Sequence, residues 1–72
     1  MPRLYSAIEL IKRLKKLGFT IVSQKGSHIK LRGLRDGKLE TAIVPNHREI
    51  ALGTLGSILK QANVTKKEID EV

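Results

Sequence analysis

Apolar residues near the start of the chain recur at helical spacing and predict an amphipathic helix between Ser6 and Gly18. One face of this helix would carry Ala7, Leu10, Ile11, Leu14 and Leu17. Ser6 stands three residues before Glu9, which is the spacing of a capping box at a helix start. Gly18 can adopt the left-handed conformation that ends many helices, so the helix should stop there.

After Gly18 the period changes to two residues, and this change indicates β-strands. Three such segments follow, at residues 19–24 (FTIVSQ), 28–32 (HIKLR) and 38–45 (KLETAIVP). The turns between them are short, and the second, GLRDG, carries an Asp-Gly hairpin signal, so we expect an antiparallel meander. In the middle segment, apolar residues on one face alternate with polar residues on the other: Ile29 and Leu31 against His28, Lys30 and Arg32.

A second helix is predicted at residues 54–63 (TLGSILKQAN), after an irregular link at 46–53. Its buried face would carry Leu55, Ile58, Leu59 and Ala62. Thr65 and Glu68 form another capping box, which should open a last short helix at residues 66–72. The predicted order is α-β-β-β-α with a helical tail, an α+β fold. Both helices should cover one face of the three-stranded sheet and leave the other face in water.

Charge is the strongest signal in the composition. The chain has 72 residues, which we expect to form a single domain over 1–72, and a formal net charge of +7. Most of the positive excess lies between residues 3 and 38, where ten Lys and Arg residues face only Glu9 and Asp36. An anionic partner is the natural inference, and nucleic acid is the commonest one. The alternative is that the charge serves only solubility.

Several classes of protein are disfavoured by what the sequence lacks. There is no cysteine, which excludes disulfides and thiolate metal sites, and the histidines and carboxylates show no metal-ligand spacing. We therefore expect no metal and no small-molecule cofactor. The chain also shows no signal peptide and no apolar run long enough to span a membrane, so a cytoplasmic protein is expected.

Three segments of the chain carry a resemblance to a known family: GSHIKL at residues 26–31, VPNH at 44–47 and GTLGSILKQANVTKKEI at 53–69. In their order and spacing they resemble the HicA family, the toxin half of the HicAB toxin–antitoxin system. The resemblance extends over almost the whole chain, beginning with IELIKRLKKLGF at residues 8–19. Two positions depart from the family pattern, because Gly56 stands where a basic residue is usual and Asn63 where glycine is usual.

The resemblance implies a fold like that of double-stranded-RNA-binding domains. It also implies a metal-independent endoribonuclease, an mRNA interferase that inhibits translation by cleaving messenger RNA. The key residue of such toxins is the histidine of the glycine–small–histidine motif, which is His28 in this chain. The expected partners are messenger RNA and a HicB-type antitoxin that covers the active surface.

The neighbours of His28 suit this chemistry. Histidine can take or give a proton near neutral pH, and nearby cations stabilise the charge that develops on a phosphate. Lys30 and Arg32 should lie on the same face, about 7 and 13 Å further along the strand. Lys25, Gly26 and Ser27 precede His28 in the turn, where they could contact the RNA backbone. The opposing interpretation is an ordinary exposed polar residue on an alternating strand.

His47 is a second candidate, because the PNH segment directly follows a strand. For this residue we favour a structural or supporting role over catalysis. Two rival functions also stay open for the whole chain: a non-catalytic double-stranded-RNA-binding module, and a protein whose basic face binds only an acidic partner.

Overall fold

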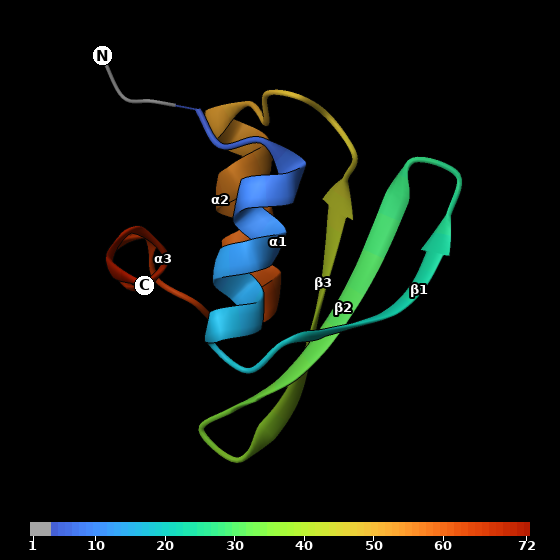
Figure 1. Ribbon diagram of the computed structural model, residues 1–72. Coiled ribbons are helices and arrows are strands. Elements are labelled where there is room, and N and C mark those ends of the chain that lie inside the picture. Colours follow the sequence, from blue (N-terminus) through green and yellow to red (C-terminus); the bar gives the residue numbers. More distant parts are fainter. Residues whose placement is uncertain (1–3) are drawn as a thin grey trace.

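The computed structural model describes residues 4–72, which form one three-stranded sheet and three helices (Figure 1). Their bounds in chain order are α1 Ala7–Lys16, β1 Thr20–Lys25, β2 His28–Arg35, β3 Lys38–Pro45, α2 Leu52–Ala62 and α3 Lys66–Glu71. The strands pair antiparallel in the order β1-β2-β3. The predicted element order, the meander and the α+β class are confirmed.

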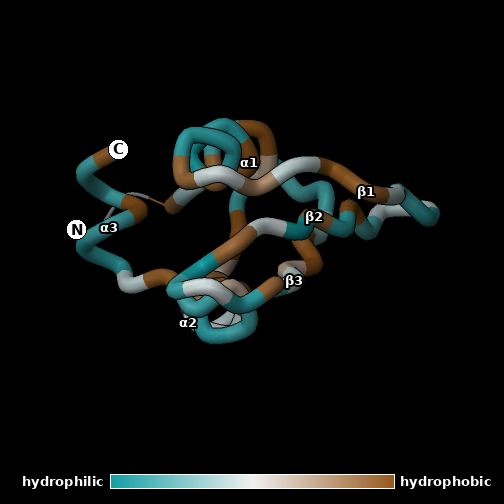
Figure 2. The backbone as a smooth tube through the Cα atoms, turned by 90° about the horizontal axis from the view of Figure 1, so that it is seen from below, coloured by the Kyte–Doolittle hydropathy of each residue, from teal (hydrophilic) through white to brown (hydrophobic). Residues whose placement is uncertain are grey.

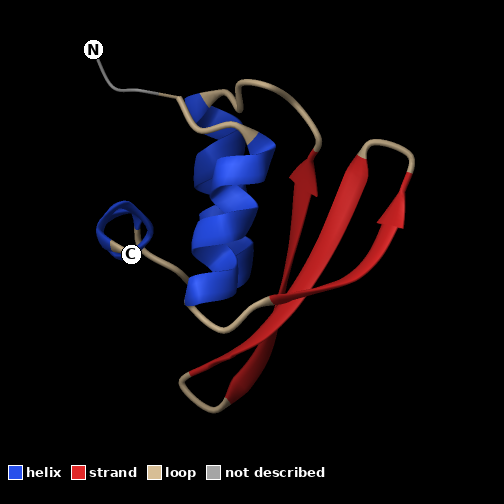
Figure 3. Cartoon of the chain, in the orientation of Figure 1, coloured by secondary structure: helices blue, strands red, loops and turns tan. Residues whose placement is uncertain are grey.

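The helices α1 and α2 lie on the same side of the sheet, one in front of the other in the view of Figures 1 and 3, and α3 lies further out. Viewed from below, the sheet forms one layer and the helices form the other (Figure 2). The buried core lies between these layers, and its largest fully buried side chains are Phe19, Leu10, Leu14, Leu31, Ile50, Ile69 and Val44. Within residues 4–72, no helix covers the opposite face of the sheet, as the sequence predicts.

Local signals set the ends of the helices. The Ser6 hydroxyl accepts a hydrogen bond of 3.1 Å from the backbone N–H of Glu9, and the Thr65 hydroxyl does the same for Glu68. Each bond satisfies one of the N–H groups that a helix start leaves without a partner. Asn63 ends α2 with a φ of 58°, the left-handed conformation that its short polar side chain tolerates.

The strand β2 is longer than the sequence predicts, since it continues through Gly33 to Arg35. Gly33 is needed inside the strand because the chain crosses it closely. A Cβ atom at this position would lie 2.9 Å from Cγ of Phe19 and 3.0 Å from the carbonyl oxygen of Gly18. The turn to β3 is only Asp36–Gly37, and both residues have positive φ, as type I′ hairpin turns require. The helix α2 also begins two residues earlier than predicted.

Polar contacts hold α3 against the rest of the molecule. A guanidinium nitrogen of Arg13 donates to the carbonyl oxygens of Ile69 and Asp70, at 3.0 and 3.1 Å. The hydroxyl of Tyr5 donates to the Asp70 carboxylate, and burial raises the pKa of this phenol, as does the hydrogen bond to Asp70. On the other side, Arg35 pairs with Glu68. Both arginines therefore help to hold α3 in place.

The described chain contains no helix that is both long and apolar enough to cross a membrane.

Candidate functional site

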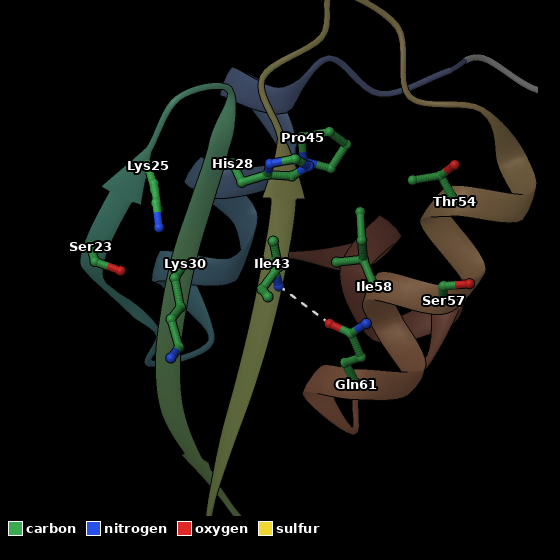
Figure 4. Close-up of a pocket in the computed structure, with 10 residues that line it drawn as sticks. All are labelled: Ser23, Lys25, His28, Lys30, Ile43, Pro45, Thr54, Ser57, Ile58 and Gln61. Atoms are coloured by element: carbon green, nitrogen blue, oxygen red, sulfur yellow. Dashed lines mark hydrogen bonds between the residues drawn. The ribbon is translucent and has the colours of Figure 1, made fainter.

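An open groove of about 850 Å³ runs between the helix-free face of the sheet and one side of α2. It is large enough for a nucleotide-sized ligand. Both the sheet and the helix contribute to its lining (Figure 4), which consists of Ser23, Lys25, His28, Lys30, Ile43, Pro45, Thr54, Ser57, Ile58 and Gln61.

Strand pairing places His28 on the middle strand, at the end of the sheet side of this groove. His28 is the first residue of β2, and its partners across the ladder are Lys25 on β1 and Pro45 on β3. Residues paired across a sheet point to the same face, so the three side chains are neighbours. Lys30 lies two residues further along β2 and is opposite Ser23. The groove therefore holds one exposed imidazole, directed toward Pro45, and two lysines from adjacent strands (Figure 4).

The other residues predicted to contact RNA lie close to the groove but do not line it. Arg32 is the next residue of β2 on the same face, opposite Thr20 and Thr41, and is half-buried. Gly26 and Ser27 form the turn that leads into His28, with Gly26 at a φ of 59°. The structure thus brings Lys25 and Lys30 together with His28, and it extends the basic face along β2 to Arg32.

Asn46 fixes the turn before His28 from a distant part of the sequence. Its backbone N–H donates a hydrogen bond of 2.6 Å to the carbonyl oxygen of Ser27. This bond joins the segment after β3 to the turn between β1 and β2. Sequence reasoning assigned Asn46 only to a link, because nothing in the local pattern shows which strand end the link would touch.

His47 does not share the groove with His28. Its carbonyl oxygen accepts a hydrogen bond of 2.9 Å from the N–H of Ala7 at the start of α1. Together with Ser6, Ile8, Asn46 and Arg48 it lines a separate and smaller pocket. The structure therefore gives no support to a pairing of the two histidines across one reaction site.

The helical side of the groove was missed by sequence reasoning. Thr54, Ser57, Ile58 and Gln61 follow the three- and four-residue spacing of one helix face, which a pattern search could have found. The side-chain oxygen of Gln61 accepts a hydrogen bond of 3.3 Å from the N–H of Ile43 (Figure 4). This bond ties α2 to the free edge of β3 and holds the helical wall in place.

The charge of the groove favours anions. None of its lining residues in the described chain carries a carboxylate, whereas two carry an ammonium group. An anion placed against the sheet would meet these lysines and the imidazole at once, without repulsion from a neighbouring acid. Within residues 4–72, no cluster of three or more His, Asp or Glu side chains could hold a metal ion.

Comparison with known protein families finds a match that covers most of the chain. The family model described as "HicA toxin of bacterial toxin-antitoxin" matches residues 8–64. The chain belongs to the HicA toxin family. The matched part of this HicA-family chain runs from α1 to just beyond α2, so it contains every residue of the groove and leaves α3 outside. No curated protein matches the chain. Family membership assigns it to the toxins of bacterial toxin–antitoxin systems.

Proposed function

We propose that this HicA-family toxin is a metal-independent endoribonuclease that cleaves messenger RNA and so inhibits translation, with His28 as its catalytic residue. The observation that carries the proposal is an exposed imidazole that shares one groove with Lys25 and Lys30, where no lining residue of the described chain carries a carboxylate. This arrangement supplies the two functions that metal-free RNA cleavage needs: proton transfer and stabilisation of phosphate charge.

The reaction is a transfer of the phosphorus from one oxygen of the RNA to another. The 2′-oxygen loses its proton and forms a bond to phosphorus, while the bond to the 5′-oxygen breaks and that oxygen gains a proton. The products are a 2′,3′-cyclic phosphate and a free 5′-hydroxyl. His28 carries one of the two proton transfers, and water that enters the open groove carries the other. Lys25 and Lys30 stabilise the extra negative charge on the phosphate.

The same basic groove is the surface that we propose for inhibition by a HicB-type antitoxin. An acidic partner seated on Lys25 and Lys30 would cover His28 and exclude RNA, since both would compete for the same cations. A toxin that acts on messenger RNA would work in the cytoplasm.

The test compares His28→Ala with His47→Ala, a matched removal of an exposed histidine outside the groove. The purified proteins are incubated with single-stranded RNA in the presence of EDTA, and the ends of the products are identified. We expect cleavage by the unmodified protein, a loss of about 10²–10⁴-fold in His28→Ala, and near-normal cleavage by His47→Ala. Thermal unfolding should be unchanged in both variants, because both side chains are exposed.

Equal cleavage by the unmodified protein and by His28→Ala would refute the catalytic role of His28. Binding to duplex RNA without any cleavage, equally strong in both, would instead identify a non-catalytic RNA-binding module.

A further inference from the structure

The two sides of the groove differ sharply in charge. The sheet side presents Lys25, His28 and Lys30, whereas the helical side presents the uncharged polar residues Thr54, Ser57 and Gln61. Between them lies an apolar floor, made by Ile43, Pro45 and Ile58 (Figure 4). A phosphate is attracted to the sheet side, because only that side carries cations. A nucleotide whose phosphate binds there has the apolar floor and α2 available for its uncharged base.

Gln61 is the oriented polar group on the helical side. Its partner, the N–H of Ile43, can only donate, so the amide oxygen must face β3 and the amide nitrogen must point elsewhere. Figure 4 shows this nitrogen turned away from Ile43. The amide is therefore held by the sheet edge with its two N–H donors facing away from the strand.

The neighbouring hydroxyl of Ser57 is already used within its own helix. It donates to the carbonyl oxygen of Gly53 at 3.3 Å, so its hydrogen is not directed at the groove. Stacking on an aromatic side chain, the common way to hold an RNA base, is also absent from this wall. Tyr5 and Phe19 are the only aromatic residues of the chain, and both are buried in the core.

We propose that Gln61 reads a base of single-stranded RNA: its amide nitrogen donates to an acceptor on the edge of a base that lies over Ile43, Pro45 and Ile58. The inference rests on the proposed function, since it assigns base selection to the site that would cleave RNA. The base must come from a single strand, because only an unpaired base can be turned outward to offer its edge. Lys25 and Lys30 contact phosphates and add affinity without sequence choice.

The test measures base preference in binding, independently of cleavage. His28→Ala protein selects RNA from a fully randomised single-stranded octamer pool, and the bound fraction is sequenced. We expect enrichment of one or two bases at a single position by about 3- to 10-fold, the selectivity that one hydrogen bond provides. Adding Gln61→Met, which keeps the side-chain length but removes the amide, should abolish this enrichment and leave affinity for the whole pool within about 2-fold.

Two further variants separate base reading from a structural effect. Gln61→Glu keeps an oxygen for the Ile43 N–H but removes the donors, so it should also lose the enrichment while the fold stays intact. Gln24→Met makes the same chemical change as Gln61→Met on β1, outside the groove lining, and should keep the enrichment of the His28→Ala protein. Thermal unfolding of each variant shows whether the sheet edge is undisturbed.

The outcomes distinguish this inference from the proposed function. Enrichment that persists unchanged in both Gln61 variants, or a complete absence of base preference, would overturn the reading by Gln61 even if the unmodified protein cleaves RNA. Conversely, loss of enrichment in both variants supports it even if the unmodified protein proves inactive as a nuclease. Failure of the His28→Ala protein to bind any RNA would overturn the inference outright.

Discussion

The two faces of β2 use neighbouring residues of one strand for opposite purposes. On the helix side, Ile29, Leu31 and Gly33 are buried, and Leu31 is completely inaccessible to solvent. On the other side, His28 and Lys30 line the open groove. Because side chains alternate along a strand, each residue belongs to one face only. Substitutions on one face should therefore change the stability of the fold, and substitutions on the other should change the binding of RNA, the ligand that we propose.

The strongest test of this separation is Leu31→Ala. Leu31 is fully buried in the core, so its truncation leaves a cavity in a small core. We expect a loss of about 2–5 kcal/mol in the free energy of unfolding, enough to leave much of a marginal domain unfolded. Urea denaturation followed by circular dichroism measures this loss. If the free energy of unfolding of Leu31→Ala lies within about 0.5 kcal/mol of the original value, the helix-facing side of β2 does not determine the stability of the fold.

The substitution of the adjacent residue, Lys30→Ala, should weaken RNA binding and leave stability almost unchanged. Removal of one phosphate contact should weaken binding to all RNA sequences alike and should reduce the slope of log K against log salt by about 0.7. Stability should change by no more than about 0.5 kcal/mol. Binding titrations at several salt concentrations test this, with Lys67→Ala on α3 as the control, since Lys67 is exposed and outside the groove lining. An identical salt dependence for Lys30→Ala and the unmodified protein would contradict the assignment.

The sequence predicts those structural features that depend on local contacts. The caps at Ser6 and Thr65, the left-handed Asn63 and the alternation along β2 all act within a few residues of the chain, so the pattern predicts them correctly. Gly33 shows where prediction from local sequence fails. A glycine before a turn signal favours a strand end, but here Gly33 continues the strand, paired with Glu40 of β3. A side chain is excluded there because a Cβ atom would lie 2.9 Å from Cγ of Phe19. Contacts of this kind depend on tertiary packing, which a single sequence does not display.

The candidate site was predictable to a similar extent. Strand periodicity predicts His28, Lys30 and Arg32 on one face, and the structure places His28 and Lys30 in the groove, with Arg32 further along β2. Lys25, expected in the turn, is instead the last residue of β1 and also lines the groove. The helical side, with Gln61, was not predictable, because it depends on where α2 packs relative to the edge of β3. For the same reason the sequence could not show that His28 and His47 line different pockets.

The docking of α3 differs from both faces of β2, because it depends on titratable groups. Its pH dependence should be a smaller effect than the two above. Hydrogen bonds from the Thr65 backbone and from Arg35 lower the pKa of Glu68. Hydrogen bonds from Lys66 and Tyr5 lower the pKa of Asp70. A carboxylate whose pKa is lower in the folded state stabilises that state above its unfolded pKa, near 4, and this contribution is lost as pH falls through the folded pKa.

We therefore expect acid to loosen α3 before it affects the sheet. Below about pH 4, amide hydrogen exchange at Ile69 should accelerate relative to exchange at Leu31, after correction for the intrinsic pH dependence of exchange. The effect should be the smallest of those considered, since both carboxylates lie at the surface, where solvent screens their interactions. Glu68→Gln removes one titrating group and should flatten part of this response. Parallel acceleration at Ile69 and Leu31 would mean that α3 and the sheet unfold as one cooperative unit, and that the polar contacts of Glu68 and Asp70 do not govern docking separately.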